Sequence, residues 1–507
     1  METDRLLLAT AADPKALYTW RAIREEASTI WSMAWKISVA TFCRLSVFTI
    51  STAFLGQLGT KELAASALAQ SIIGGLRIVT WAFATSMSTL CGQAYGAKNY
   101  ELVGIWLQMG LVVLVVISIP LVVAHFYAYL ILQYVTSDVE LLEMAQTFAN
   151  YTALSVFPNA VYVAFRSYLR AQEIVTPTAV IDTANVFLSI GANYVFIYGW
   201  GSWSGFGFIG SPLASFFSAT AQPIALFLYA FVFGQYHKKT WFGWSWQCVE
   251  ATRLKQFVSL TSTFLVYLAL DEWIYNVIAI VTAQLGSLNL AANSVLCNIW
   301  GLAYGVYMGF STPIQVRVSH ALGANDPVKA KHVMAVGFGL GAIATLVVMF
   351  AILVTRYSLV TVFTQDAALQ EILVAMLPIF CVAAGISGFH VMLSSVLEAM
   401  SLALTLVFVS GVGSWAALLP ASYYLGIQLN FGLAGLWWGS VIGEGVKFCI
   451  TSTALFWLYD WAKIAQRISD EANGDEEVED IEKEAQEAFV TVDTLKSPVA
   501  AVTNVSF

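Results

Sequence analysis

The sequence predicts an all-α integral membrane protein with twelve transmembrane helices in two pseudo-symmetric six-helix lobes. Three observations predict this fold: the composition, the number of long apolar stretches and an internal repeat. Of the 507 residues, 58% are hydrophobic and only 11% are charged, whereas soluble domains are about 45–50% apolar and about 25% charged. A chain with so few polar side chains cannot cover several soluble cores.

Twelve stretches are long enough to cross a membrane. A spanning helix needs about 20 apolar residues, because its backbone polar groups must be satisfied within the segment. By this criterion the predicted helices are 33–56, 67–90, 104–128, 145–167, 175–198, 207–232, 258–283, 291–315, 332–356, 372–396, 402–424 and 433–459.

The short loops orient these helices. Most of their Lys and Arg residues lie on the side of the N-terminus, and the cytoplasmic side retains such residues. We therefore expect a multi-pass protein with both termini in the cytoplasm. The expected segments are a cytoplasmic N-terminal segment at 1–28, an N-lobe at 29–232, a linker at 233–257, a C-lobe at 258–460 and an acidic cytoplasmic tail at 461–507.

The net charge of −8 belongs to the tail. Residues 470–507 hold 11 acids and two bases, so they carry −9 and the rest of the chain carries +1. This composition predicts a disordered tail. No basic surface exists for nucleic acid. The sequence also lacks a nucleotide loop, a catalytic triad and a Cys/His metal motif, so we expect neither an enzyme nor a bound cofactor or metal.

An internal repeat defines the architecture. An offset of 227 residues places Gln57-Leu58-Gly59 on Gln284-Leu285-Gly286, and Gly96-Ala97 on Gly323-Ala324. A six-helix unit has an even number of spans, so both copies enter the membrane from the same side. Parallel repeats of this kind are typical of transporters whose site lies between the halves. A multi-span receptor or scaffold is the alternative from another functional class.

Four motifs resemble a known family. They are Cys-Gly-Gln-Ala-Tyr-Gly-Ala at 91–97, Tyr-Leu-Arg-Ala-Gln at 168–172, Val-Arg-Val-Ser-His-Ala-Leu-Gly-Ala at 316–324 and Gly-Leu-Trp-Trp-Gly at 435–439. In this order they resemble the multidrug and toxic compound extrusion (MATE) family, in its eukaryotic form. The resemblance implies a monomeric antiporter that exports small organic compounds in exchange for protons, or alternatively sodium, across the lipid bilayer.

The motif residues themselves have structural interpretations. Gly92, Gly96 and Gly323 are expected to let the chain turn tightly at helix ends. Arg317 is expected to bind helix-terminal carbonyls or lipid headgroups.

Two adjacent acids, Asp271 and Glu272, lie within the seventh predicted helix. A carboxylate at bilayer depth is costly unless it is paired or hydrated, so such residues are functional candidates. Plant and animal members of the MATE family carry an essential glutamate in this helix. Counting back 15 residues from Gly286 selects Asp271, whereas aligning Trp273 selects Glu272. We expect Asp271 to carry the proton and keep Glu272 as the alternative.

The other candidates in the C-lobe are mostly uncharged: Asn276, Asn298, Tyr304 and His390. Ser387 stands where many relatives hold a second acid, so His390 is the titratable group inside the tenth apolar run. It serves either as a proton relay or as a structural histidine. Coupling therefore rests on Asp271 and Glu272.

The candidates in the N-lobe are Asp182, Asn185, Arg44 and Arg77. Asp182 serves either in a proton relay or in a buried pair with one of the arginines. If both arginines face the cavity, they favour organic anions such as carboxylates.

Glu444 and Lys447 lie three residues apart and are expected to neutralise each other. Glu2, Leu6 and Leu7 have the spacing of an acidic dileucine sorting signal. The plasma membrane and the vacuolar or endosomal membrane are both compatible with this sequence.

Overall fold

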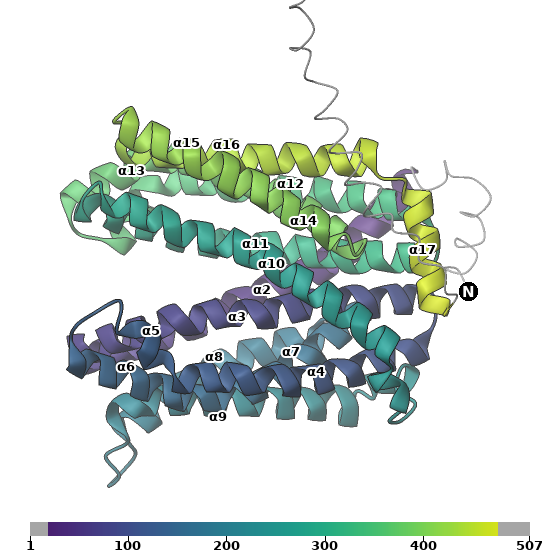
Figure 1. Ribbon diagram of the computed structural model, residues 1–507, viewed down its shortest axis with the longest axis horizontal. Helices are drawn as coiled ribbons and strands as arrows, with labels where there is room; N and C mark the ends of the chain where they lie inside the picture. Colours follow the sequence, from purple (N-terminus) through teal and green to yellow (C-terminus); the bar gives the residue numbers. More distant parts are fainter. Residues whose placement is uncertain (1–18, 475–507) are drawn as a thin grey trace, which may run out of the picture.

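The computed structural model describes residues 19–474, which form long helices running along one common direction (Figure 1). The predicted all-α fold with two six-helix lobes is confirmed. The N-lobe lies in the lower half of this view and most of the C-lobe in the upper half. The dileucine residues and the segment 475–507 fall outside the described residues.

The N-lobe and the linker consist of α2 (Trp20–Leu58), α3 (Thr60–Gly96), α4 (Tyr100–Phe126), α5 (Ala128–Leu132), α6 (Val139–Thr152), η2 (Ala153–Ser155), α7 (Val156–Ala171), α8 (Thr176–Tyr198), η3 (Gly207–Ile209), α9 (Gly210–Phe227), η4 (Leu228–Phe233), η5 (Tyr236–Lys239) and η6 (Trp246–Val249). The C-lobe and the helix after it consist of α10 (Ala251–Ala283), α11 (Ser287–Gly323), α12 (Pro327–Phe363), α13 (Ala367–Ala399), α14 (Ala403–Ser410), η7 (Gly411–Leu418), α15 (Leu419–Tyr423), η8 (Tyr424–Gln428), α16 (Gly432–Thr453), η9 (Ala454–Leu458) and α17 (Trp461–Asn473).

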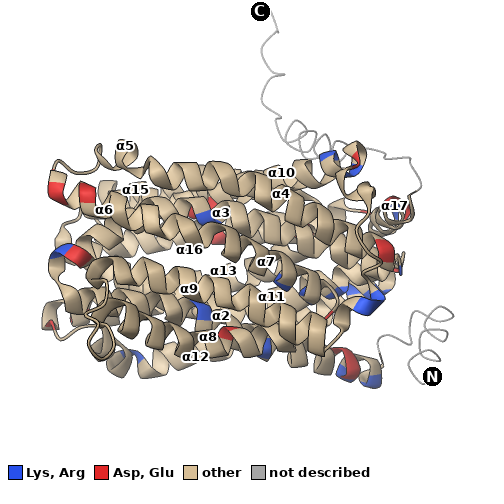
Figure 2. Ribbon diagram, turned by 90° about the horizontal axis from the view of Figure 1, so that it is seen from below, with Lys and Arg blue, Asp and Glu red and all other residues tan. Residues whose placement is uncertain are grey.

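Ten of these helical segments in the described chain are long and apolar enough to cross a membrane. The other two spans of the twelve are α11, whose polar residues lower its hydropathy, and the interrupted segment α6–η2–α7. Figure 2 shows that charged residues gather at the two ends of the helices and are sparse between them. This distribution fits a bilayer around the middle of the molecule.

The repeat is visible in the helix boundaries. α3 begins at Thr60 and α11 at Ser287, and these starts differ by the same 227 residues as the sequence repeat. The next helices repeat the same N-cap: Asn99 accepts a hydrogen bond from the N–H of Leu102, and Asp326 accepts one from the N–H of Lys329. The repeat therefore extends to the hydrogen bonds that cap these equivalent helices.

The lobes approach closely where Gly96 and Gly323 end their helices. A Cβ at Gly96 would lie 2.2 Å from the carbonyl oxygen of His320, and a Cβ at Gly323 would lie 2.0 Å from that of Gln93. The expectation that these glycines make tight turns was wrong, because neither has a positive φ. They allow the backbones of the two lobes to touch.

Most predicted boundaries differ from the structure by several residues, as α3 (Thr60–Gly96, predicted 67–90) does, and two differences have a local cause. The first helix begins at Trp20 instead of residue 33, because Thr19 caps it by accepting a hydrogen bond from the N–H of Ala22. The predicted helix 145–167 is interrupted at η2. Pro158 cannot donate a backbone hydrogen bond there, which favours a break in the preceding turn.

The expectation of disorder from residue 461 was also wrong, because α17 is an ordered helix. Figure 1 places it across the ends of the other helices, at one end of the molecule. Its buried face holds Trp461, Ile464 and Ile468, which recur at helical spacing. The side-chain amide of Asn99 donates to the carbonyl of Ala472 at 2.8 Å, so α17 also contacts the N-lobe.

Candidate functional site

Three charged side chains inside the C-lobe form what we call the carboxylate–lysine cluster: Asp271 on α10, with Glu444 and Lys447 on α16. Lys447 Nζ lies 3.3 Å from Asp271 Oδ1 and 2.7 Å from Glu444 Oε1. Ser414 Oγ donates to Asp271 Oδ1 at 3.1 Å. The expected contact between Glu444 and Lys447 therefore exists, but Lys447 is also shared with Asp271. Two carboxylates surround one ammonium group.

Burial distinguishes the members of this cluster. The side chains of Glu444 and Lys447 are each 3% exposed, whereas that of Asp271 is 24% exposed. Glu444 accepts a hydrogen bond from Tyr275 at 3.3 Å, but its second oxygen has no partner among the described residues. Removing charges from water costs several kcal/mol unless they are paired. Asp271 is therefore the most exposed member of the cluster.

The helix η7 shapes the surroundings of Lys447. It is a π-helix, a form that occurs frequently at functional sites. A Cβ at Gly413 in this helix would lie only 2.1 Å from Lys447 Cγ. Glycine at this position therefore makes room for the lysine beside Asp271.

The neighbouring acid Glu272 has different surroundings. It forms no ion pair within 4 Å in the described part of the chain, and its electrostatic attraction is to Arg77 of the N-lobe. Adjacent residues on a helix point about 100° apart. Asp271 thus faces the interior of the C-lobe, while Glu272 is oriented toward the opposite lobe.

Two further sequence candidates lie near the cluster. Tyr304 stacks on Trp300 with 5.0 Å between ring centroids, and Trp300 lies 5.9 Å from Tyr275. His390 is buried and its Nε2 has no hydrogen-bond partner among the residues described. It lies within electrostatic range of Asp271 and Lys447.

The two asparagines are not part of this cluster. Asn276 and Asn298 are both exposed, and Asn298 donates to the carbonyl of Ser294 in its own helix. Within the described residues, neither forms a hydrogen bond to Asp271.

In the N-lobe, Asp182 on α8 is fully buried and accepts three hydrogen bonds. The donors are Tyr162 at 2.6 Å, Arg44 at 3.2 Å and Gln222 at 3.2 Å. Of the two arginines considered from the sequence, Arg44 is the one that pairs with it.

Arg77 instead lies over the ring of Phe48 at 5.8 Å and donates to Gln70 at 3.4 Å. Asn185 is buried, and its Oδ1 has no partner in the described chain.

Sequence reasoning missed three charged residues: Arg166 and Arg170 on α7, and Glu398 at the end of α13. The arginines are buried within electrostatic range of Asp182, and Glu398 lies within electrostatic range of Tyr267 and Tyr304. Arg166 lay inside a predicted span and could have been found as a charge at membrane depth. Arg170 was considered only as part of the motif at 168–172, and Glu398 lay just beyond the predicted helix end.

The lobes are joined by a cluster of ion pairs at the end of the molecule that carries α17. Arg317 Nη2 donates to Glu26 Oε2 at 2.7 Å, Arg317 Nε also bonds Glu26, and Arg317 Nη1 donates to Glu173 Oε1 at 2.7 Å. His320 Nδ1 lies 3.3 Å from the same oxygen of Glu173. Arg317 therefore binds two carboxylates of the N-lobe, and the expectation of helix-terminal carbonyls or headgroups was wrong.

Glu173 lies in the loop between α7 and α8. Burial opposes its ionisation, but the hydrogen bond with His320 and the charge of Arg317 outweigh this and lower its pKa to about 2. Further bonds join the lobes nearby, from Gln93 to the carbonyl of Ala399 at 2.8 Å and from Gln315 to Thr89 at 3.1 Å. This end of the interface is closed.

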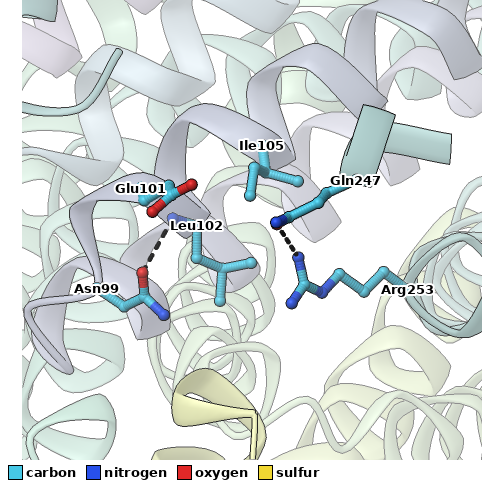
Figure 3. Close-up of a pocket in the computed structure, with 6 residues that line it drawn as sticks. All are labelled: Asn99, Glu101, Leu102, Ile105, Gln247 and Arg253. Atoms are coloured by element: carbon cyan, nitrogen blue, oxygen red, sulfur yellow. Dashed lines mark hydrogen bonds between the residues drawn. The ribbon is translucent and has the colours of Figure 1, made fainter. Parts of the chain in front are cut away.

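A small pocket of about 200 Å³ lies between the start of α4 and the linker (Figure 3). Its lining residues are Asn99, Glu101, Leu102, Ile105, Gln247 and Arg253. Asn99 caps α4, and Arg253 donates to Gln247 at 3.1 Å. The pocket contains no residue of the carboxylate–lysine cluster. Within the described residues, no group of three or more His, Cys, Asp or Glu side chains could hold a metal ion.

Comparison with known proteins places this chain in a family. The MatE family model matches residues 37–195 and again residues 264–423, once in each lobe. Protein DETOXIFICATION 36 of Arabidopsis thaliana is 27% identical over 424 residues, covering 82% of each chain. Multidrug and toxin extrusion protein 1 of Mus musculus is 27% identical over 452 residues, covering 89% of this chain and 78% of its own.

Solved structures show the same fold. The eukaryotic MATE transporter AtDTX14 superposes with a TM-score of 0.81 at 20% identity, covering 89% of this chain and 99% of its own. An outward-facing multidrug resistance MATE transporter of the MOP superfamily gives a TM-score of 0.78 at 16% identity, covering 89% and 97%. The resemblance inferred from the four motifs is confirmed. The chain belongs to the MatE family of multidrug and toxin extrusion transporters, which are integral membrane proteins and not enzymes.

Proposed function

We propose that this protein exports small organic compounds in exchange for protons, as a monomer, with Asp271 as the proton-binding residue. The observation that carries the proposal is the sharing of Lys447 between Asp271 and Glu444. Two carboxylates and one ammonium leave a formal charge of −1, so the cluster accepts one proton without acquiring positive charge. Glu272 is the alternative proton carrier.

Protonation would change the packing around Lys447. Neutral Asp271 no longer attracts the ammonium, which then pairs with Glu444 alone. Ser414 also loses its charged acceptor, and it belongs to the π-helix η7 that packs against α16. These changes bias the C-lobe toward a second arrangement, and a bound substrate is released if it prefers the first arrangement.

The closed end of the lobe interface supports a direction for the cycle. We place both termini in the cytoplasm, because the short loops on that side are rich in Lys and Arg. The contacts of Arg317 and Gln93 then close the cytoplasmic side. Asp271 takes its proton from the opposite side, and exchange of proton for substrate proceeds as the lobes rock.

The test uses purified full-length protein in proteoliposomes, with labelled tetraethylammonium and labelled succinate as probes of opposite charge. A pH gradient and a sodium gradient are imposed separately. The proposal predicts that the pH gradient drives movement of at least one probe and that sodium alone does not. Movement driven by sodium alone would contradict proton coupling and favour the sodium-coupled alternative.

A further inference from the structure

A group of arginines inside the N-lobe has no role in the proton cycle. Arg44 on α2, with Arg166 and Arg170 on α7, form what we call the arginine cluster. The guanidinium carbon of Arg166 lies 5.7 Å from the ring centroid of Tyr162. Each of the two α7 arginines is repelled electrostatically by Arg44, and both are attracted by Asp182. The three positive charges therefore occupy one region of the lobe.

The negative charge in this region is insufficient to neutralise the three arginines. In the described part of the N-lobe, Asp182 is the carboxylate that attracts these arginines, and it already accepts bonds from Tyr162, Gln222 and Arg44. Glu173 lies three residues after Arg170, but it is bound to Arg317 and His320. Three guanidinium groups and one carboxylate leave a formal charge of +2.

The α7 arginines also have buried donors without acceptors. Arg166 and Arg170 are 9% and 8% exposed, so neither extends into solvent. The Nε of Arg166, and the Nε and Nη2 of Arg170, have no hydrogen-bond partner among the described residues. Arginine stays protonated in proteins, and a buried charge without a partner is costly. A structural role would be expected to provide acceptors for these donors.

We propose that the arginine cluster binds an organic dicarboxylate inside the N-lobe. The planar guanidinium fork matches a carboxylate with two parallel hydrogen bonds. A dianion neutralises the excess charge of +2, and two carboxylate groups supply acceptors for both α7 arginines. Arg44, whose side chain is 30% exposed, is the member that an entering ligand meets first.

This assignment names a substrate class for the transporter, and in that respect it rests on the proposed function. The anion and the proton bind in different lobes, because Asp271 lies in the C-lobe. Neither ligand displaces the other directly, so their coupling must pass through movement of the lobes.

The test is calorimetric binding of succinate to the purified full-length protein in detergent, without any ion gradient. The protein is expected to bind succinate more tightly than inorganic phosphate. Arg166→Gln and Arg170→Gln are each expected to raise the Kd at least tenfold, and Arg166→Lys to give an intermediate value. Arg356→Gln serves as the matched control, because Arg356 lies in the other lobe, where it donates to Tyr357. The Kd of this variant for succinate is expected to equal that of the parent.

A thermal unfolding measurement separates binding from structure. The ligand-free glutamine variants are expected to unfold at the same temperature as the parent or higher, since each loses buried donors that lack acceptors. Succinate is expected to stabilise the parent and not the variants. A lower unfolding temperature in the ligand-free variants, with no succinate stabilisation of the parent, would mean that the arginines are structural and would overturn the proposal.

The remaining outcomes also support or overturn the proposed dicarboxylate site. Absence of succinate binding, equal Kd values in parent and variants, or tighter binding of phosphate than of succinate overturns the dicarboxylate site. Proton-driven export of tetraethylammonium without succinate binding removes this inference and leaves the proposed function intact. Arginine-dependent succinate binding without gradient-driven transport supports the site and contradicts the proposed function.

Discussion

Arg317→Gln is expected to open the closed end of the lobe interface. The substitution removes the charged bonds to Glu26 and Glu173 and leaves two carboxylates of the N-lobe facing an uncharged amide. Truncating one partner of a buried ion pair costs about 3–5 kcal/mol. Glu173 is 30% exposed, so solvent screening lowers this to about 2–3 kcal/mol.

Arg317 belongs to the C-lobe and both carboxylates belong to the N-lobe, so they separate when this end opens. The loss of free energy therefore falls on the closed state alone. A loss of about 2–3 kcal/mol lowers the ratio of closed to open molecules by about 30- to 150-fold. Spin labels at Glu101→Cys and Lys331→Cys, both exposed near this end on opposite lobes, report the distance by double electron–electron resonance.

Arg317→Gln is expected to shift this distance distribution toward longer values. Lys61→Gln is the control, because its ion pair with Glu140 is exposed and lies within the N-lobe. An unchanged distribution in Arg317→Gln, measured with the exposed native cysteines removed, would refute the reasoning that this ion-pair cluster closes the interface.

Three further predictions follow from the same geometry. Gly413→Ala is expected to reduce proton-driven transport by at least tenfold because its Cβ would displace Lys447, whereas Gly411→Ala, with nothing within 4 Å, retains the parent rate in the same uptake assay. Lys447→Met leaves two acids without their shared cation and is expected to lower stability by about 3–5 kcal/mol, which a reduced thermal unfolding temperature checks; an unchanged temperature would contradict the pairing. The lowered pKa of Glu173 means that its stabilising effect is complete above the unfolded pKa near 4.5 and is lost only as the pH falls toward about 2. Glu173→Gln is therefore expected to reduce the closed population by the same factor at pH 5 and pH 8 in the resonance experiment, and a loss confined to pH 8 would count against this assignment.

The sequence predicted the fold because membrane helices leave long apolar runs and the duplication leaves matching ends. Thr60 and Ser287 begin equivalent helices at the repeat offset. The helix α17 was missed because composition was averaged over a tail dominated by acids. Its own residues Trp461, Ile464 and Ile468 recur at helical spacing, which was the available signal.

The candidate site was only partly predictable. Asp271 was identified because a carboxylate in an apolar run is conspicuous. Its partner Lys447 lies 176 residues away, and no local pattern connects them. The pairing of Lys447 with Glu444 was predictable because three residues on one helix bring side chains together. Arg166 could have been identified by considering every charged residue inside a predicted span.

Proton-driven transport by Asp271→Asn tests the central claim most directly. The measurement compares pH-gradient-driven movement of a transported probe in liposomes containing the parent, Asp271→Asn or Glu272→Gln at equal protein content. Exchange of probe without a gradient confirms that each variant is folded and inserted. The account predicts that Asp271→Asn loses gradient-driven transport while exchange persists, and that Glu272→Gln keeps both. Undiminished gradient-driven transport by Asp271→Asn would contradict it.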